Sequence, residues 1–188
     1  FKYNTKIQNI LTNYKKITGI NSEQGVFVAD KYVYACGAYG NNLLDGIKVK
    51  SMVCPLKGYS LSIQADDIEY IAPKIALTDP ENKVVYSRIG NVFRAAGTVE
   101  ICGLRANQNK SHTEFLLKKI NSTFSDAGNL NEVSEWFGFR PFRPNSIPLI
   151  SKTKQYDNLF LNVGHGSLGW TLSAGSRKLI ADLINGKG

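Results

Sequence analysis

The chain has 188 residues, of which 43% are hydrophobic and 20% are charged. This composition excludes disordered, collagen-like and disulfide-scaffold proteins, and the length predicts one domain or two small ones with a sizeable core. The net charge of +8 is uneven, with +5 on residues 1–58, −1 on residues 59–142 and +4 on residues 143–188. If both ends pack together, they form a basic lobe that favours a phosphate-bearing ligand or an anionic membrane surface; solvated lysines are the alternative.

Cysteine and histidine usage points to a cytosolic protein without a metal. Cys36, Cys54 and Cys102 are odd in number and have apolar neighbours, which indicates buried, reduced thiols. No cysteine pair has metal-ligand spacing, and His112 and His165 lie far apart, so we expect no metal site. Nucleic acid is not an expected partner, because no basic run is interleaved with aromatics. No apolar run approaches the length of a membrane span.

The first third of the chain predicts short strands. The chain begins at Phe1 instead of a methionine, and the alternating pattern that follows suggests that a preceding segment has been removed. Strands are expected over residues 2–11, 31–35, 53–63 and 74–77, a hairpin over 17–20 and 25–28, and one helical turn over 41–44.

The middle of the chain contains a clear hairpin signal. Val84–Ile89 and Val92–Ile101 are β-rich runs separated by Gly90-Asn91, so they are predicted to be antiparallel neighbours. Ser111 and Glu114 match a capping box, which predicts the start of a helix. Apolar residues follow at helical spacing at Leu116, Leu117, Ile120 and Phe124.

The last third predicts a strand, a glycine-rich turn and a helix. Residues 136–142 favour a strand that is interrupted by Pro141 and Pro144. Residues 159–163 form a second apolar strand, and a helix is expected from about Ser167 to Asn185.

The turn between that strand and that helix matches a phosphate-binding pattern only in part. Residues 164–169 fit G-x-G-x-x-G, follow a strand and open a helix. The acid expected about 20 residues later is missing, because Asp182 lies inside the helix itself, so this is not a complete dinucleotide unit. Two interpretations remain: an anion bound at the helix N-terminus, or a tight turn that needs glycine for its geometry alone.

Seven segments carry a resemblance to a known family. They are Tyr34–Tyr39, Pro55–Leu61, Val84–Arg88, Ala96–Glu100, Gly138–Pro144, Ile147–Ile150 and Tyr156–Thr171. In this order they resemble the D-amino acid oxidase family of flavoproteins, and within it the bacterial D-amino acid dehydrogenases.

The resemblance implies an α+β fold with two domains. Residues 59–142 would form an antiparallel-sheet substrate domain. Residues 1–58 and 143–188 would form a partial, Rossmann-like FAD-binding domain that lacks its N-terminal βαβ unit. That missing half, in the same or a separate chain, would be a partner.

The implied activity is FAD-dependent oxidative deamination of D-amino acids to 2-oxo acids and ammonia. Electrons would pass to a respiratory acceptor. The expected location is the cytoplasm, with a peripheral position on the inner membrane face as an option.

The resemblance also implies roles for individual residues. Arg140 matches the arginine that binds the substrate carboxylate, although an isolated arginine is more often solvated or ion-paired. Tyr59 and Tyr86 are candidate substrate-pocket residues, with sheet aromatics as the alternative. The implied FAD-binding residues, for which core packing is the alternative at Ile7 and around Cys36, are Ile7, Ala35, Cys36, Gly37, Tyr39, Gly164, His165, Gly166, Ser167, Leu168, Gly169, Trp170 and Thr171.

One departure leaves the substrate open. After the arginine the dehydrogenases usually have Met-Thr-Pro-Asp-Gly, whereas this chain has Phe-Arg-Pro-Asn-Ser at residues 142–146. A related glycine or sarcosine oxidase is therefore an alternative. A second alternative is a non-catalytic remnant of a split or truncated gene that does not bind FAD alone.

Overall fold

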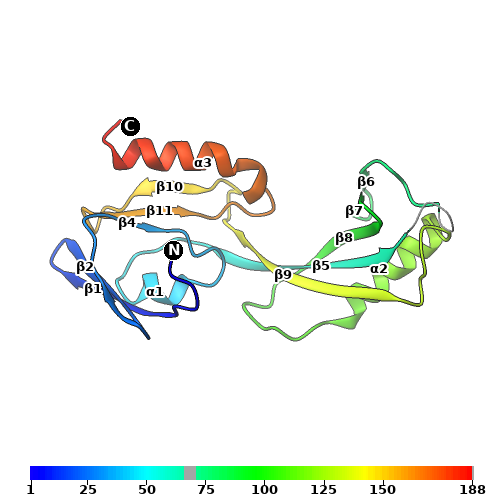
Figure 1. Cartoon of the computed structure of the whole chain (residues 1–188), viewed down its shortest axis with the longest axis horizontal. Coiled ribbons are helices and arrows are strands. Elements are labelled where there is room, and N and C mark those ends of the chain that lie inside the picture. Colours follow the sequence, from blue (N-terminus) through cyan, green and yellow to red (C-terminus); the bar gives the residue numbers. More distant parts are fainter. Residues whose placement is uncertain (66–70, 188) are drawn as a thin grey trace. The chain divides into compact units, whose positions relative to one another are not determined.

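The computed structural model describes residues 1–65 and 71–187 and divides into two compact units (Figure 1). Unit 1 consists of residues 1–55 and 140–188, and unit 2 of residues 56–139. Both contain helices and antiparallel strand pairs, so the expectation of a mixed fold with antiparallel sheets is confirmed. No described helix is long and apolar enough to span a membrane.

The N-terminal part of unit 1 is a small antiparallel sheet. Strands β1 (Ile7–Asn13), β2 (Lys16–Ser22) and β3 (Gly25–Phe27) lie in that order, and β2 pairs with both neighbours. Helix α1 (Asn41–Asp45) contacts β1. The predicted hairpin of β2 and β3 is confirmed, whereas β1 begins five residues later than residue 2.

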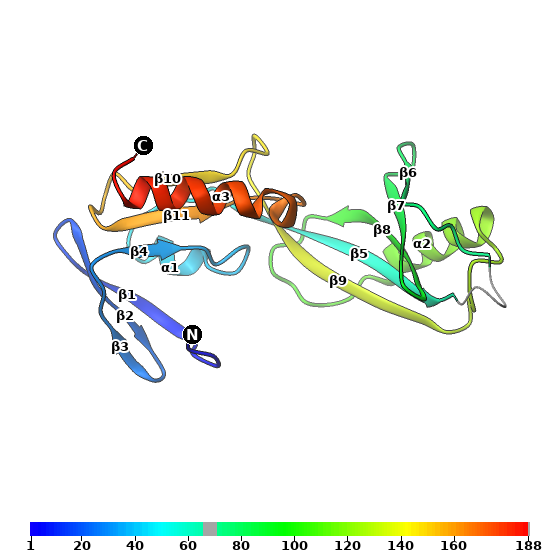
Figure 2. The ribbon, with the colours of Figure 1, turned by 45° about the horizontal axis from the view of Figure 1, so that its top comes forward.

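A second sheet of unit 1 contains a parallel strand pair. Strand β4 (Tyr32–Tyr34) runs parallel to β11 (Leu159–Val163), and β10 (Leu149–Lys152) pairs antiparallel with the other edge of β11. Helix α3 (Gly169–Ile184) lies along β10 and β11 (Figure 2). Strand β11 has little exposed surface because its two faces meet the core and α3, as is usual for a parallel strand.

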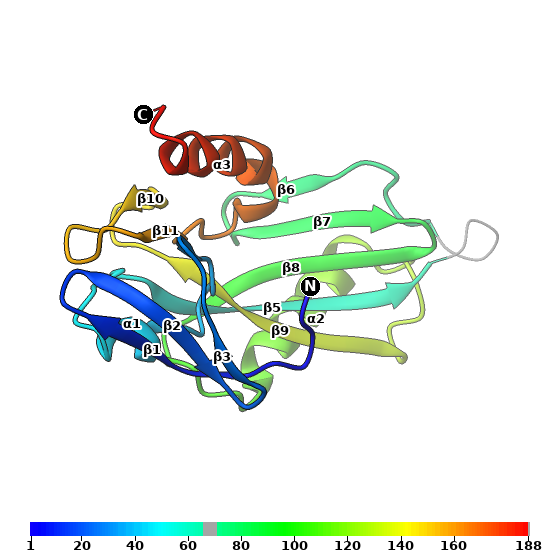
Figure 3. The same ribbon diagram turned by 60° about the vertical axis from the view of Figure 1, so that its left-hand side comes forward.

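Unit 2 is built on one five-stranded sheet (Figure 3). Its order is β6 (Leu77–Asp79), β7 (Val84–Ile89), β8 (Val92–Glu100), β5 (Cys54–Gln64) and β9 (Val133–Phe142). Helix α2 (Lys110–Thr123) packs on one face, where its Leu116 and Ile120 join a core with Tyr59, Leu61 and Phe93. The predicted hairpin of β7 and β8 around Gly90-Asn91 is confirmed.

Several sequence expectations need correction. Helix α2 is capped by Asn109, whose Oδ1 accepts from Ser111 N at 3.2 Å, so the predicted capping box at Ser111 is wrong. The side chain of Asn109, two residues before Ser111, serves as the N-cap instead, so the helix begins at Lys110. Strand β9 begins at residue 133 and continues through Pro141, which the edge position of β9 tolerates. Strand β6 starts where the predicted strand over 74–77 ends, and β10 was not predicted. The predicted burial of the cysteines is confirmed for Cys102 and is wrong for Cys36 and Cys54, which are exposed.

Candidate functional site

The glycine-rich turn joins β11 to α3 in a tightly packed conformation. Gly164 and Gly166 have φ angles of +83° and +58°, a region that favours glycine. A Cβ atom on Gly164 would lie 2.4 Å from Cδ of Arg143, and one on Gly166 would lie 3.2 Å from the ring of Phe142. Gly166 N also donates to Pro141 O at 2.9 Å. The glycines therefore allow the turn to pack directly on the segment that follows Arg140.

Helix α3 presents free amide groups at its N-terminus. Its N-cap residue, Leu168, makes no side-chain capping hydrogen bond, and its first turn contains no acidic residue. The first amides of a helix lack intrahelical partners and carry a partial positive charge. Beside them His165 Nε2 lies 2.9 Å from Ser176 Oγ, and burial lowers the pKa of His165, which favours its neutral form.

A pocket of about 300 Å³ in unit 1 lies beside this turn. Five of the predicted FAD-binding residues line it, namely Ala35, Gly37, Gly164, His165 and Gly169. The other lining residues are Pro141, Asn162, Val163, Ser173, Ser176 and Arg177. The structure thus brings the end of β4, the glycine turn and the first turns of α3 together around one space.

The pocket combines positive charge with an unused acceptor. Arg177 supplies a guanidinium, and the N-terminus of α3 adds the partial charge of its amides. Asn162 Oδ1 is buried and has no hydrogen-bond partner among the described residues, which is unfavourable unless a ligand or water donates to it. Gly37 has φ +58°, and no atom lies within 4 Å of the position of a Cβ. This arrangement suits a polar, anionic ligand that needs close access to the backbone.

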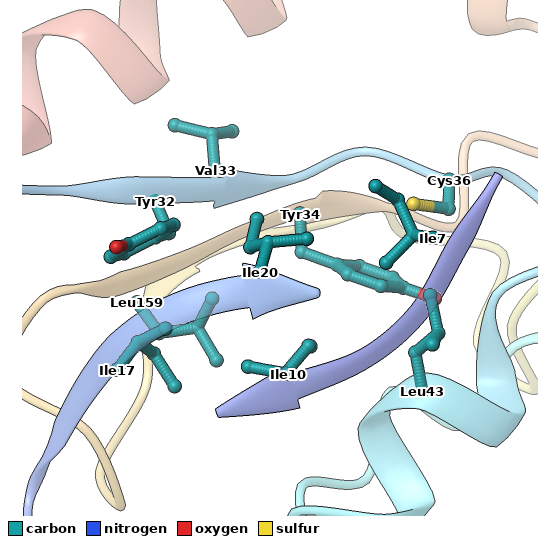
Figure 4. Close-up of a pocket in the computed structure, with 10 residues that line it drawn as sticks. All are labelled: Ile7, Ile10, Ile17, Ile20, Tyr32, Val33, Tyr34, Cys36, Leu43 and Leu159. Atoms are coloured by element: carbon teal, nitrogen blue, oxygen red, sulfur yellow. The ribbon is translucent and has the colours of Figure 1, made fainter. Parts of the chain in front are cut away.

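A second, apolar pocket of about 70 Å³ lies between β1, β2 and β4 (Figure 4). Ile7 and Cys36, two further predicted FAD-binding residues, line it together with Ile10, Ile17, Ile20, Tyr32, Val33, Tyr34, Leu43 and Leu159. The Tyr34 hydroxyl is buried, and burial raises the pKa of Tyr34 well above its ordinary range. This pocket can accept a flat apolar group, but its residues also fit simple core packing.

The remaining predicted FAD-binding residues line neither pocket. They are Tyr39, Gly166, Ser167, Leu168, Trp170 and Thr171. Trp170 is 94% exposed, and Tyr39 and Leu168 are also exposed. Their cofactor roles stay predictions.

The predicted substrate-binding residues lie in different surroundings. Arg140 is half-buried in β9, immediately before Pro141, which lines the 300 Å³ pocket. Tyr59 and Tyr86 are buried in the core of unit 2. The Tyr59 hydroxyl donates to Glu100 Oε2, and Tyr86 packs against Phe93 and Phe124. Contact of these three residues with a substrate stays a prediction.

Sequence reasoning missed four polar residues of the pocket. Asn162 interrupts the apolar run of β11, which was a usable signal. Ser173, Ser176 and Arg177 recur at helical spacing along α3, so they share one face of that helix. Among the described residues, no three metal-ligating side chains lie close enough to hold a metal ion.

Comparison with protein families and curated proteins gives consistent matches. The model of the DAO family, described as FAD dependent oxidoreductase, matches residues 1–183. A D-amino acid dehydrogenase of Paramagnetospirillum magneticum is 37% identical over 187 residues, and one of Granulibacter bethesdensis is 40% identical over 187 residues. Both alignments cover 100% of this chain and 44% of the relative. The chain therefore spans less than half the length of these relatives.

Solved structures share the fold at low sequence identity. A glycine oxidase from Geobacillus kaustophilus superposes with a TM-score of 0.83 at 20% identity, covering 98% of this chain and 49% of that structure. An L-proline dehydrogenase from P. horikoshii gives a TM-score of 0.82 at 18% identity, covering 98% and 50%.

Proposed function

Because the chain belongs to the DAO family of FAD-dependent oxidoreductases, we propose that it is the C-terminal portion of an FAD-dependent D-amino acid dehydrogenase. The supporting observation is the alignment of the whole chain, at 37–40% identity, with proteins named D-amino acid dehydrogenase. In the intact enzyme the substrate would be a D-amino acid, and the products a 2-oxo acid and ammonia.

The polar pocket of unit 1 fits part of a flavin cofactor. Ala35, Gly37 and the glycine turn would lie against it, Asn162 Oδ1 would accept a hydrogen bond from it, and the α3 amides would face its negative charge. The apolar pocket around Ile7 would take an apolar ring. When bound, FAD supplies the capacity to accept the two electrons of amine oxidation.

The residues of this chain would bind and orient the substrate and would stabilise the charge that develops during the reaction. Arg140 would hold the substrate carboxylate with its planar guanidinium, which is always charged and binds carboxylates in a bidentate manner. The N-terminus of α3 would stabilise negative charge that appears next to it. The amino acid loses the hydride of its α-carbon and one amino proton, and water then hydrolyses the imino acid to the 2-oxo acid and ammonia.

The proposed partner is an N-terminal half that carries the rest of the FAD-binding domain, on the same or a separate chain. Strand β4 is the last strand of its sheet, so its outer edge has no partner strand among the described residues. Val33 in β4 is 45% exposed, and α3 exposes Leu172 and Leu179. A parallel strand and its following helix would cover this edge and these apolar side chains.

We propose a cytoplasmic location for the intact enzyme, at the inner membrane face, with a respiratory-chain component as the electron acceptor. The support is the excess of basic residues in unit 1, which favours an anionic surface.

Two alternatives differ from this proposal in substrate or in catalytic competence. The similarity to a glycine oxidase structure favours a glycine or sarcosine oxidase, and turnover of glycine, sarcosine and D-alanine separates these substrates. The second alternative is a non-catalytic remnant of a split or truncated gene that does not bind FAD alone.

An FAD titration tests the cofactor site. The chain would be joined to the N-terminal portion of the Granulibacter bethesdensis relative, and binding followed by flavin absorbance and fluorescence. We expect stoichiometric binding, weakened about tenfold or more by Gly37→Val, which fills the open space at the pocket.

Gly25→Val is the matched control. Gly25 also has a positive φ, +108°, with no atom near its Cβ position, and it lines neither pocket. Equal FAD affinity for the Gly37 variant and the control would rule out this pocket as the cofactor site. A joined protein that binds no FAD would support the remnant.

A further inference from the structure

One face of the unit 2 sheet carries polar side chains close to its centre. Tyr59 and Leu61 of β5 point into the core under α2, so Ser60 points to the opposite face. In β8, Phe93 and Ala95 belong to the core, which places Arg94 on the same face as Ser60. Arg94 Nη2 donates to Ser60 Oγ at 3.0 Å.

An exposed indole lies over the Arg94 guanidinium. The Cζ atom of Arg94 is 5.6 Å from the ring centroid of Trp136 on β9. Trp136 is nevertheless 57% exposed, whereas Ser60 is 2% exposed. The Ser60 hydroxyl and the Trp136 indole hold the Arg94 guanidinium in one orientation. Because the side chain is already ordered, a ligand would bind with a smaller loss of side-chain conformational entropy.

This guanidinium has hydrogen-bonding capacity that the described residues do not use. Arg94 Nε is buried without an acceptor, and within residues 1–65 and 71–187 no carboxylate pairs with Arg94. The buried Lys57 of this unit does have a carboxylate, with Nζ 3.1 Å from Glu100 Oε2. A half-buried guanidinium without a counter-ion is unfavourable, because its N–H groups have given up water without gaining acceptors.

We propose that Arg94, Ser60 and Trp136 form a binding site for the carboxylate of a small organic acid. The planar guanidinium matches a carboxylate better than a spherical anion, and the exposed indole offers contact area to the organic part of the ligand. The site lies within unit 2 and requires no flavin, so it does not depend on the proposed function. The carboxylate has two candidate sources, an amino acid or a 2-oxo acid.

The fluorescence of Trp136 provides a direct readout. The chain contains two tryptophans, so Trp170→Phe leaves Trp136 as the only one. This variant would be titrated with pyruvate, D-alanine and acetate at constant ionic strength, with sodium chloride as the reference. We expect a saturable change in Trp136 emission with pyruvate or D-alanine, and the tighter of the two identifies the source.

Variants at Arg94 establish the origin of the response. We expect Arg94→Gln to weaken binding about tenfold or more, because charge-assisted hydrogen bonds are lost, and Arg94→Lys to weaken it less. Arg105→Gln removes the same charge from an exposed arginine of unit 2 and should leave binding unchanged. Circular dichroism checks folding, and Ser60→Ala serves as the second variant, with an expected loss of several fold.

Three results would overturn the proposal. They are the absence of any saturable response, a response that sodium chloride reproduces, and equal affinity for Arg94→Gln and the unsubstituted chain. An NMR titration gives an independent check, since the Arg94 Nε–H resonance should shift as the carboxylate binds. A resonance that stays fixed at saturation would also contradict the site.

Discussion

The two units differ in charge and in how fully the long helix of each unit buries its apolar side chains. Unit 2 carries 9 basic and 10 acidic residues, and α2 covers one face of its sheet through Leu116 and Ile120, both 0% exposed. Unit 1 carries 14 basic and 5 acidic residues, and it exposes Trp170 and Leu179 on α3. Helix α2 therefore buries its apolar side chains within unit 2, whereas unit 1 offers positive charge, pockets and the exposed apolar side chains of α3 to a ligand and a partner.

A pair of leucine truncations should separate the two units most strongly. Leu116→Ala removes a fully buried side chain and should lower the free energy of unfolding of unit 2 by about 2–5 kcal/mol. Leu179→Ala in unit 1 truncates a side chain that is 56% exposed and should change stability by less than about 0.5 kcal/mol. Urea unfolding followed by far-ultraviolet circular dichroism measures the loss of stability in both variants. Equal losses in the two variants would contradict the contrast.

A pair of glycine substitutions sharpens the contrast within unit 1. Gly164→Ala would place a Cβ 2.4 Å from Arg143 Cδ, and Arg143 is held by Ser51 O and Ile147 O. With φ at +83°, this variant should lose about 1–3 kcal/mol of stability. Gly175→Ala, in α3 with no atom near its Cβ, should gain about 0.5–1 kcal/mol. A Gly164→Ala protein as stable as the original, measured by thermal unfolding, would show that the turn is not tightly packed.

The smallest expected effect concerns the pH dependence of unit 2. Hydrogen bonds from Tyr59 and Lys57 lower the pKa of Glu100 below its ordinary value of 4.5. The unfolded state therefore binds the proton more tightly, and the stabilisation is complete above pH 4.5 and lost as the pH falls through the lowered folded-state pKa. Glu100→Gln should flatten this part of the profile of melting temperature against pH. Glu114→Gln, exposed on α2, is the control, and identical profiles for all three proteins would contradict the prediction.

Local signals predicted the elements whose determinants are adjacent in sequence. The Gly90-Asn91 turn placed β7 and β8 with the correct partners, and the apolar run of β11 was predicted with its observed bounds. Strand β10 was missed because four residues after a proline carry little signal, and β10 forms only by pairing with β11. The helix start was predicted wrongly because two polar side chains that lie two residues apart, Asn109 and Ser111, could each cap it, and Asn109 does so.

The candidate site was predictable in its backbone but not in its polar residues. The glycine pattern located the turn before α3, and the pocket beside it contains five of the predicted residues. Asn162 and Arg177 join that pocket only because β11 and α3 pack together, which no local pattern encodes. Arg94 on β8 and Trp136 on β9 meet across β5, which lies between these two strands in the sheet, so their contact also required the fold.

Turnover by the joined protein tests the central proposal most directly. The chain would be fused to the N-terminal portion of the Granulibacter bethesdensis relative, and D-alanine-dependent reduction of a dye acceptor measured with FAD present. We expect turnover that falls about a hundredfold or more in Arg140→Ala, because the substrate carboxylate loses its bidentate partner, while Arg105→Ala retains it. Unchanged turnover in Arg140→Ala, or no turnover in a joined protein that binds FAD, would contradict the assignment.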